Sequence, residues 1–540
     1  MSEEGLSIYH FVEKRAVEKP DGQAVIAGGR TLTCRQLDEQ SRDFAAGLLE
    51  CGLEPGDRTV LMVTPSTDFM VVTFGLLRMG AIPIFIDPGM GWKNLGRCLE
   101  EAEPEAFIGI PRAQLGRKLF GWARQSLRHS VTVTRLPWWP GKTHLQVARK
   151  GRRRASEFQA SRWSETAAIA FTSGSTGTPK GVVYTHRMFS AQARLLQGSF
   201  GIEPGEVDLA TFPLFGLFDP AMKVTTVFPN MDYSRPGSVD PKQIFETIRQ
   251  YSVTHLFGSP ALLRRVGPYA REGRIQTPTI RRVLSAGAPV PRDVIETVKA
   301  FLPAHSEVFT PYGATEALPV TSISGTELLS EDGPERGLGV CVGKPLEGVN
   351  AATIAVTDDP VSEWGDGLAL PPGEIGEIVV WGDNVSESYF RRPDADRLGK
   401  IVGPQGRVRH RMGDLGYFDS KGRIWFCGRK SHRVQTPHGV LYSVNCEEIF
   451  NAHPAVFRSA LVGVGRAPRQ RPVICVELEA GHRKEDPRKL IEEILRVGSS
   501  HLQTSRIDAV LFHPSFPVDV RHNSKIFREK LALWAEEQLR

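Results

Sequence analysis

The stretch Thr172-Ser-Gly-Ser-Thr-Gly-Thr-Pro-Lys-Gly181 is a run of small hydroxyl and glycine residues with one lysine near its end. Glycine lets a backbone turn tightly and approach a ligand closely, and we expect Gly174, Gly177 and Gly181 to adopt positive φ angles for this purpose. Hydroxyl groups, free backbone N–H groups and the charge of the lysine can then surround an anion. Because the apolar run Ala167–Phe171 precedes it, the stretch predicts a phosphate-binding loop after a buried strand.

Two other interpretations of this stretch are weaker. A Walker A loop requires Gly-Lys-Ser/Thr with a further glycine five residues earlier, and the one Gly-Lys-Thr run, Gly141–Thr143, has Leu136 at that position. A flexible surface linker does not require Pro179-Lys180-Gly181 after an apolar run. We therefore expect the stretch to bind phosphate.

Length and composition are those of an ordinary globular protein with room for several domains. The chain has 540 residues, of which 41% are apolar and 24% charged. The net charge is +6, but the basic residues are scattered without an aromatic-rich basic motif, so nucleic acid is not expected as a partner. The densest basic cluster, Arg149–Arg154, predicts a solvated loop, with contact to an anionic membrane or a protein as the alternative.

Cysteine usage and the N-terminus predict a cytoplasmic protein. Seven cysteines occur without a Cys-x-x-Cys pair, which is typical of free thiols in a reducing compartment. The first residues, Met1–Gly5, are acidic and unlike a signal peptide. No apolar run approaches the roughly 18 residues that span a bilayer, so we expect no transmembrane segment.

Apolar runs alternate with helical patterns over most of the chain. Arg58–Val63 predicts a strand, Thr67–Met79 an amphipathic helix ended by Gly80, and Ala81–Ile86 the next strand. Such alternation predicts βαβ units and an α/β fold with largely parallel sheets.

The pattern changes in the last third of the chain. Around Pro371–Val380, short strands separated by glycine turns predict a small β-rich subdomain over about 340–428. The segment 429–540 has a compact α+β pattern. Two helices are expected there, over Lys489–Val497 and Ile526–Leu539. We predict an N-terminal domain, 1–428, and a C-terminal domain, 429–540, with a hinge at Ser431.

Four further clusters combine residue types that suit nucleotide chemistry. They are Tyr312-Gly-Ala-Thr-Glu316, Met412-Gly-Asp414, Gly428-Arg429 and Lys525-Ile-Phe-Arg-Glu-Lys-Leu531. Each is weak alone, because a solvated Glu, a turn Asp or a surface Lys would look the same. Their order and spacing, together with the phosphate loop, resemble the adenylate-forming superfamily of acyl-CoA synthetases, luciferases and peptide-synthetase adenylation domains. The resemblance covers almost the whole chain and implies a large N-terminal domain with a small, mobile C-terminal lid.

The resemblance also implies ATP and Mg²⁺ as cofactors and a role for each matching residue. The residues that match the loop around the β- and γ-phosphates are Thr172, Ser173, Gly174, Ser175, Thr176, Gly177 and Lys180. Those that match the adenine site are Gly287, Ala288, Pro289, Tyr312 and Gly313. Thr315 would contact the α-phosphate and Glu316 would hold Mg²⁺. Asp414 would accept the ribose hydroxyls with help from Arg429, and Lys525 would reach from the lid to the carboxylate and the α-phosphate. Such an array of positive charge suits the attack of a carboxylate on a phosphate.

The chain departs from the superfamily pattern at the lid and at the acyl site. Pro517 stands eight residues before Lys525, Ser524 replaces a glycine, and the hinge position, usually Asp or Lys, is Ser431. The segment Phe212–Asp219 lacks the histidine that is common there and is aromatic instead. It predicts a pocket for a long acyl chain, with Phe215 and Phe218 as candidate lining residues and a plain core strand as the alternative.

Three segments resemble one subgroup of the superfamily, the bacterial β-lactone synthetases of olefin biosynthesis. They are Phe212–Pro220, Thr310–Pro319 and Pro517–Lys525. The resemblance implies ATP-dependent adenylation of a long-chain 2-alkyl-3-hydroxy acid, after which the substrate's own 3-hydroxyl attacks the acyl carbon and expels AMP. An intramolecular nucleophile has a high effective molarity, so CoA is not required. Other enzymes of the same lipid pathway are possible partners.

Three alternatives stay open from the sequence. The first is a long-chain fatty acid–CoA ligase, which is the commoner activity of proteins with this architecture and would need CoA. A ligase that loads a carrier is disfavoured because no Gly-Gly-x-Ser carrier site occurs. A catalytically dead scaffold is disfavoured by the presence of Lys180, Glu316, Asp414 and Lys525. The base for the 3-hydroxyl is open, with His438 and His522 as weak candidates.

Overall fold

The computed structural model of the protein describes residues 7–136, 139–153, 158, 161–172, 179–330, 338–518 and 526–540. Several predicted site residues lie outside these ranges: Ser173, Gly174, Ser175, Thr176, Gly177, His522, Ser524 and Lys525. Their roles stay predictions.

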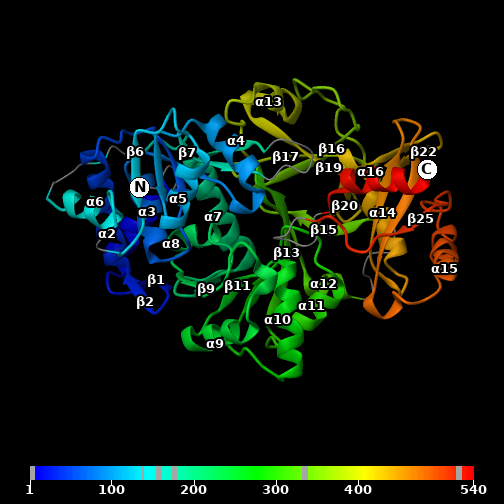
Figure 1. Ribbon diagram of the computed structural model, residues 1–540, viewed down its shortest axis with the longest axis horizontal. Helices are drawn as coiled ribbons and strands as arrows, with labels where there is room; N and C mark the ends of the chain where they lie inside the picture. Colours follow the sequence, from blue (N-terminus) through cyan, green and yellow to red (C-terminus); the bar gives the residue numbers. More distant parts are fainter. Residues whose placement is uncertain are drawn as a thin grey trace.

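A mainly parallel sheet forms around the predicted βαβ unit (Figure 1). Its strands, in spatial order, are β6 (His129–Thr132), β5 (Ala106–Gly109), β3 (Arg58–Met62), β4 (Ile82–Phe85), β7 (Thr166–Phe171) and β8 (Gly181–Thr185). The predicted strands over 58–63 and 81–86 are confirmed as β3 and β4, which pair in parallel. The last pair, β7 and β8, is antiparallel, so β8 runs in the opposite direction to the other strands at this edge of the sheet.

The helix predicted between β3 and β4 is confirmed as α3 (Thr67–Arg78), but its amphipathic character is wrong. Nearly every side chain of α3 is buried, including that of Arg78, which is only 1% exposed. The helix contacts α1 and α2 as well as β1 and β4, so the protein covers it on all sides. The guanidinium of Arg78 is neutralised by Asp38 and Glu13, which explains how a charged residue can be enclosed there.

The second, larger sheet joins both halves of the chain. Its strands, in spatial order, are β16 (Asn350–Ile354), β17 (Gly376–Trp381), β19 (Val408–Phe418), β20 (Ile424–Arg429), β15 (Val340–Pro345), β14 (Ala317–Ser324), β13 (Glu307–Ala314), β12 (Arg282–Leu284), β11 (His255–Phe257), β9 (Val207–Ala210), β10 (Thr225–Phe228), β1 (Gln23–Ala27) and β2 (Arg30–Thr33), with β18 (Lys400–Val402) beside β19. Pairing is parallel from β1 through β13 and antiparallel from β14 onward. The expected β-rich segment therefore extends this sheet, and the described strands of 340–429 share it with the βαβ part.

Helices cover and separate these two sheets. They are α1 (Ile8–Glu18), α2 (Cys34–Glu50), α3, α4 (Trp92–Ala102), α5 (Pro111–Phe120), α6 (His144–Gly151), α7 (His186–Phe200), α8 (Asp219–Met222), α9 (Pro241–Tyr251), α10 (Pro260–Glu272), α11 (Arg292–Lys299), α12 (Gly325–Leu329) and α13 (Pro393–Gly399). The largest apolar cluster joins α1, α2, α3 and α7 to strands of both sheets, so one core holds the two sheets together. Among the described residues, no helix combines the length and the apolar composition that crossing a bilayer requires.

The C-terminal segment forms its own small α+β unit at one side of the molecule (Figure 1). It contains β21 (Val434–Thr436), β22 (Gly439–Leu441), α14 (Ser443–Phe450), β23 (Val456–Val464), β24 (Arg471–Leu478), α15 (Pro487–Ser499), β25 (Val510–Phe512) and α16 (Arg528–Leu539). Two apolar clusters lie within it. The α/β fold class with a large N-terminal and a small C-terminal part is confirmed, and both expected helices exist as α15 and α16. The domain boundary at 428/429 and the mobility of the lid stay predictions.

Gly428 lies where the large sheet meets the C-terminal unit. Its φ is 125°, and a Cβ at this position would lie 2.4 Å from Oγ of Ser443 at the start of α14. Only glycine combines this backbone conformation with so close an approach. The predicted hinge residue Ser431 follows in a short 3₁₀ turn, Lys430–His432, and is exposed.

Candidate active site

The described ends of the predicted phosphate loop are held together by backbone pairing. The N–H of Thr172 donates to the carbonyl of Lys180 at 3.0 Å, and Phe171 pairs with Gly181 across β7 and β8. The positive φ expected at Gly181 is wrong, because this residue begins β8 in an ordinary strand conformation. A Cβ on Gly181 would lie 2.9 Å from Cγ2 of Ile169, so close packing is what requires glycine.

Tyr389 connects the base of this loop to the predicted metal ligand. Its hydroxyl donates to Oε1 of Glu316 at 2.8 Å, and Nζ of Lys180 lies 5.0 Å from the centre of its ring. Burial, followed by the charge of Glu316, raises the pKa of the Tyr389 hydroxyl, which therefore stays a donor. The neighbouring backbone is fixed by the N–H of Phe390, which donates to the carbonyl of Gly181 at 2.7 Å. Tyr389 thus contacts both predicted residues, Lys180 through its ring and Glu316 through its hydroxyl.

A buried lysine that the sequence did not single out lies on the same ring. Nζ of Lys400 is 5.1 Å from the centre of the Tyr389 ring and donates to the carbonyl of Ser386 at 2.5 Å. Burial lowers the pKa of Lys400 to about 8, although the charges of Glu316 and Asp396 oppose the shift. No local motif marks Tyr389, because its partner Glu316 lies 73 residues away in the sequence. Lys400 is brought to Glu316 through the ring of Tyr389.

Thr315 and Glu316 form the turn between β13 and β14, and their backbone is held from two sides. The hydroxyl of Tyr184 donates to the carbonyl of Thr315 at 2.6 Å, and the N–H of Ser386 donates to the carbonyl of Glu316 at 2.8 Å. A Cβ on Gly313 would lie 2.6 Å from the carbonyl oxygen of Ala317, so the turn needs glycine there. Oε2 of Glu316 accepts no hydrogen bond from any described residue, which suits the role of Mg²⁺ ligand that the sequence predicts for this carboxylate.

Asp414 on β19 is placed between Tyr312 on β13 and Arg429 on β20. Its Oδ2 accepts from the Tyr312 hydroxyl at 2.6 Å, and its Oδ1 forms an ion pair with Nη1 of Arg429 at 3.0 Å. Within the described part of the chain, Oδ1 accepts no hydrogen bond. Burial raises the pKa of Asp414, and the charge of Arg429 counters this. The three predicted residues are therefore brought together, and Oδ1 of Asp414 is paired with Arg429 by charge alone.

The predicted adenine-site turn, Gly287–Pro289, follows the end of β12. Gly287 has a φ of 94°, as a tight turn requires. The N–H of Ser285 donates to the carbonyl of Phe309 on the neighbouring strand β13 at 2.9 Å, and Tyr312 follows on that strand. Because β12 and β13 are parallel, this turn and Tyr312 lie at the same edge of the sheet.

The aromatic segment Phe212–Asp219 is not a strand, so the alternative of a plain core strand is wrong. It forms a turn and a short 3₁₀ helix, Phe215–Leu217, before α8. Phe215 packs on Phe257 with ring centres 4.7 Å apart, and Phe218 packs on Phe189 at 6.0 Å. Phe189 in turn contacts Tyr184, whose hydroxyl binds the Thr315 carbonyl. A continuous series of aromatic contacts therefore leads from this segment to the Thr315–Glu316 turn.

In the C-terminal unit, Arg528 is anchored three residues after the predicted lid lysine. Its guanidinium binds Glu447 of α14 with a shortest contact of 2.6 Å. Glu447 is 7% exposed, so this ion pair is shielded from water. His438, one of the two candidate bases, lies exposed in the turn between β21 and β22.

Comparison with known proteins agrees with this geometry. A family model described as AMP-binding enzyme matches residues 12–390. The olefin beta-lactone synthetase of Stenotrophomonas maltophilia K279a is 46% identical over 541 residues, which cover 97% of each chain. The protein of the same name from Xanthomonas campestris pv. campestris is 46% identical over 539 residues, which cover 97% of this chain and 96% of that one. Among solved structures, an o-succinylbenzoate CoA synthetase of Bacillus subtilis in complex with ATP and magnesium ion has the same fold, with a TM-score of 0.76 and 20% identity over 96% of this chain and 98% of that one.

Proposed function

The chain belongs to the AMP-binding enzyme family, and we propose that it adenylates a long-chain 2-alkyl-3-hydroxy acid with ATP and closes the product to a β-lactone. The observation that carries this proposal is 46% identity along 97% of the chain to two olefin beta-lactone synthetases. The same family membership supports ATP and Mg²⁺ as cofactors. The o-succinylbenzoate CoA synthetase of Bacillus subtilis, which has the same fold, was solved in complex with ATP and magnesium ion.

In the first half-reaction, a carboxylate oxygen of the acid attacks the α-phosphorus of ATP, and diphosphate leaves. We propose that Lys180 and the loop before it bind the β- and γ-phosphates, while Asp414 and Tyr312 hold the nucleoside. Bound to Glu316, Mg²⁺ would neutralise phosphate charge. The Tyr389 hydroxyl fixes one oxygen of Glu316 and leaves the other for the metal. The chain's contribution to this step is alignment and charge neutralisation.

In the second half-reaction, the 3-hydroxyl oxygen attacks the acyl carbon, its proton goes to a base, and AMP leaves with the electron pair of the acyl–oxygen bond. The nucleophile is part of the substrate, so its effective concentration is far above that of a free thiol. The partly exposed rings of Phe212, Phe215 and Phe257, which contact one another, support this proposal, because such an apolar surface suits long alkyl chains.

We also infer that the enzyme works in a reducing compartment such as the cytoplasm. All seven cysteines are free thiols, and most of them are buried. Burial raises the pKa of Cys98, Cys427 and Cys446 to about 12, so these thiols stay protonated and unreactive.

The deciding experiment is incubation with ATP, Mg²⁺ and a synthetic long-chain 2-alkyl-3-hydroxy acid, with and without CoA, followed by mass spectrometry. We expect equimolar β-lactone, AMP and diphosphate without CoA. A product that forms only with CoA, as an acyl thioester, would establish the alternative of a fatty acid–CoA ligase. Absence of any ATP–diphosphate exchange with the acid would contradict both.

A further inference from the structure

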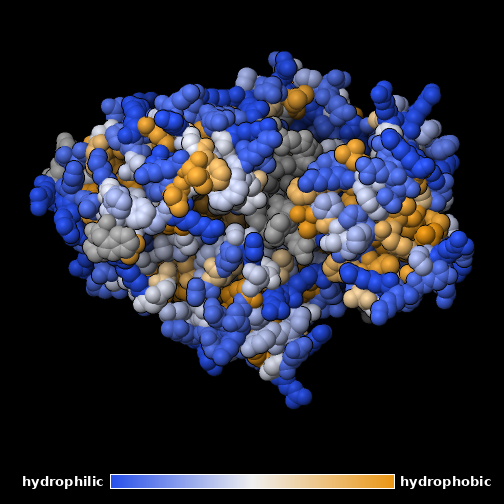
Figure 2. Space-filling model, in the orientation of Figure 1, coloured by the Kyte–Doolittle hydropathy of each residue, from blue (hydrophilic) through white to orange (hydrophobic). Residues whose placement is uncertain are grey.

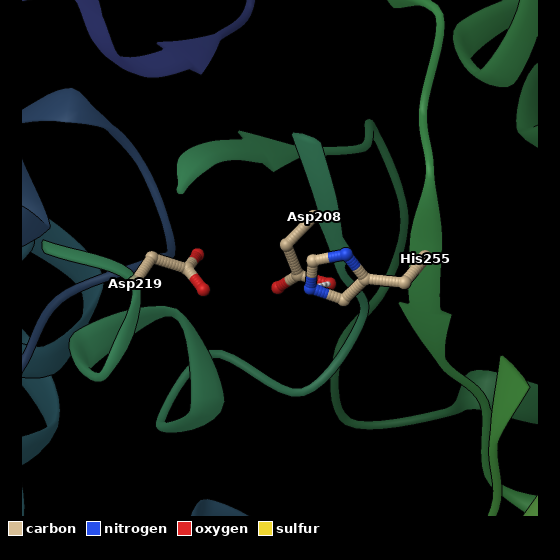
Figure 3. A group of neighbouring side chains, drawn as sticks. All are labelled: Asp208, Asp219 and His255. Atoms are coloured by element: carbon tan, nitrogen blue, oxygen red, sulfur yellow. Dashed lines mark ion pairs between the residues drawn. The ribbon is translucent and has the colours of Figure 1, made fainter. Parts of the chain in front are cut away.

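Three ligand-type side chains outside the predicted ATP site meet in the interior of the large sheet (Figure 3). Asp208 lies on β9, His255 on the neighbouring strand β11, and Asp219 at the start of α8. Asp208 and His255 occupy paired positions of parallel strands, so their side chains share one face of the sheet. One ligand atom from each residue lies within 4.8 Å of the other two, and the residues are only 4%, 3% and 1% exposed, in the order named.

The histidine is oriented by a second carboxylate behind it. Nδ1 of His255 lies 3.0 Å from Oε2 of Glu206, which also binds Arg282. Because a carboxylate can only accept, Nδ1 carries the proton and Nε2 keeps its lone pair on the side of Asp208. A carboxylate behind a histidine in this way is the usual outer shell of a protein-bound metal. Burial lowers the pKa of His255, which favours the neutral form that binds metals.

The two carboxyl oxygens of Asp219 differ in their hydrogen bonding. Its Oδ2 accepts from the Thr226 hydroxyl at 2.7 Å, whereas its Oδ1 is buried and accepts no hydrogen bond from any residue of the described ranges. The carboxyl points toward that of Asp208 in Figure 3. Burial raises the pKa of Asp219, although the Thr226 hydroxyl and the charge of Arg15 oppose the shift. The Arg15 guanidinium itself donates to the carbonyls of Val224 and Gln23.

We propose that Asp208, Asp219 and His255 bind one divalent transition-metal ion such as Zn²⁺ or Mn²⁺. Two adjacent carboxyl groups in a dry interior must either share a proton or hold a cation, and a divalent ion balances the charge of both carboxylates. Nε2 of His255 is 3.7 Å from Oδ1 of Asp208, which is too long for a hydrogen bond. The same separation suits two ligands that each lie about 2.0–2.2 Å from one ion. The imidazole disfavours Ca²⁺ and Mg²⁺, which prefer oxygen ligands.

The ion would have a structural role at the end of the aromatic segment Phe212–Asp219. It would tie β9 and β11 to Asp219, which directly follows Phe218. The position of Phe215 and Phe218 would then depend on the ion, although neither side chain is a ligand.

The test uses the full-length protein without ATP. Elemental analysis of the purified protein should give about one equivalent of a transition metal per chain. After chelation under mild denaturant and refolding, Co²⁺ should bind with the same stoichiometry and produce visible d–d absorption that Zn²⁺ removes. D219N should lose this absorption, whereas E316Q, altered at the predicted Mg²⁺ ligand, should keep it.

D208N provides a second ligand variant in case D219N fails to fold, and circular dichroism reports the fold of each. The proposal is overturned if the wild type binds no stoichiometric metal. It is equally overturned if both aspartate variants keep the absorption, or if E316Q alone removes it. A metal-free wild type that is less stable at pH 7 than D219N would instead identify a carboxyl pair sharing one proton.

A second, independent observation concerns the surface over α4 and α5. Four large apolar residues are exposed there, with exposed fractions of 56% for Trp92, 67% for Leu115, 74% for Leu119 and 50% for Phe120. The rings of Trp92, Phe120 and Trp122 lie nearly parallel, with centres 5.3–5.6 Å apart. Figure 2 shows apolar side chains gathered in this region. We name these four exposed residues the α4–α5 patch.

The α4–α5 patch is bordered by positive charge. Residues 111–128 contain five basic residues and no acidic one. They are Arg112, Arg117, Lys118, Arg124 and Arg128. In α4, Lys93 and Arg97 are balanced by Glu100 and Glu101, so the positive charge comes from α5 and the residues after it. Aromatic and leucine side chains within a basic border are the composition of interfacial membrane anchors. We infer that the α4–α5 patch docks on an anionic lipid surface.

Vesicle sedimentation tests this inference. The protein should bind vesicles of phosphatidylglycerol and phosphatidylcholine, less so at high salt, and should bind phosphatidylcholine alone weakly. The variant L115S/L119S should bind the anionic vesicles at least about tenfold more weakly, because it removes two inserting side chains. The control L502S/L533S, altered at two exposed leucines of the C-terminal unit, should bind like the wild type. Equal binding of both variants, or loss of self-association instead of vesicle binding in L115S/L119S, would contradict the inference.

Discussion

At the scale of single residues, the Tyr389–Glu316 pair sets the geometry of the candidate site. Glu316 sits in a turn whose backbone is bonded on both sides, and the Tyr389 hydroxyl fixes one of its oxygens. The same tyrosine ring lies beside Lys180 and Lys400. A carboxylate held in this way needs little rearrangement to bind a metal ion, which is the advantage of preorganisation.

Glu316→Gln should lower ATP–diphosphate exchange at least about tenfold, equal to about 1.4 kcal/mol of transition-state stabilisation. The amide keeps the volume of the side chain but loses the negative charge that binds Mg²⁺. Tyr389→Phe, which keeps the carboxylate and removes its donor, should have a smaller effect. Glu347→Gln, at an exposed position, serves as the control. Wild-type exchange in the Glu316 variant would remove this residue from the metal site.

Asp414→Asn should raise the Kd for ATP at least about tenfold, because one acceptor for the ribose hydroxyls is lost and a buried polar group goes unpaired. Isothermal titration with ATP measures this change. Thermal unfolding of the same variant reports the weakened pair with Arg429. Unchanged ATP affinity together with a large loss of stability would make Asp414 a structural residue only.

At the scale of elements, α2 and α6 cross at two glycines. A Cβ on Gly47 would lie 1.9 Å from the carbonyl oxygen of Val147, and one on Gly151 would lie 1.9 Å from that of Asp43. The backbones therefore touch where any side chain would separate them. This close crossing helps hold α6 against the large N-terminal core.

Gly47→Ala should destabilise the protein by about 1–3 kcal/mol or more, because the methyl group overlaps a backbone oxygen that cannot move alone. Gly198→Ala in α7 is the matched control, since nothing lies within 4 Å of a Cβ there. That variant should be neutral or stabilise by up to about 1 kcal/mol through helix propensity. Urea unfolding compares the two, and equal midpoints would show that the α2–α6 crossing can relax.

The segment before α16 carries the prediction that separates the two half-reactions. Lys525→Ala should lower β-lactone formation from acid and ATP by about 10²–10³, as expected for one donor aimed at developing charge. A synthetic 3-hydroxyacyl-adenylate bypasses that step and should still be converted. Lys530→Ala, at an exposed position of α16, is the control.

Two other outcomes for Lys525→Ala are informative. Loss of both half-reactions would mean that the lysine also acts in ring closure. Normal turnover from acid and ATP would remove Lys525 from the mechanism, together with the alignment of Pro517–Lys525 on which its role depends.

At the scale of the whole molecule, buried ion pairs tie distant segments together and make stability depend on pH. Arg411 and Lys430 both bind Glu377, which is 1% exposed, beside the predicted hinge. Asp419 fixes the connection between β19 and β20, where it accepts from the Trp425 indole at 3.0 Å and from Nε of Arg423 at 2.7 Å. Burial alone would raise the pKa of Asp419, but these hydrogen bonds outweigh it and lower the pKa from 3.8 to about 2.

The lowered pKa of Asp419 predicts a loss of stability in acid. A carboxyl with a depressed folded-state pKa contributes its full stabilisation above its unfolded pKa near 3.8 and loses it as the pH falls through about 2. The difference in unfolding free energy between wild type and D419N should therefore shrink by about 1 kcal/mol between pH 6 and pH 3. Urea unfolding at several pH values measures it. A difference that is independent of pH would mean that Asp419 stabilises the protein without titrating.

Much of the fold and part of the site could be predicted from the sequence because their signals are local. The alternation of apolar runs and helical patterns predicted β3, α3 and β4, and the motifs around Glu316, Asp414 and Arg429 named residues that the structure brings together. Local patterns cannot tell which faces of an element are covered, so α3 was expected to be amphipathic although neighbours bury it on all sides. Gly181 was expected to turn with a positive φ, whereas close packing on Ile169 is what requires it.

The sequence by itself determined the α/β fold class through its alternating apolar and helical patterns. Its short motifs also carried the resemblance to the adenylate-forming family, and that resemblance supplied the candidate ATP-binding residues, whose roles stay predictions. Only the tertiary structure decided that Tyr389 and Lys400 join Glu316, and that Asp208, Asp219 and His255 form one buried cluster. The order of strands in a sheet brings these groups together across long stretches of chain. That order depends on how the crossover helices pack, and no local pattern of residues encodes it.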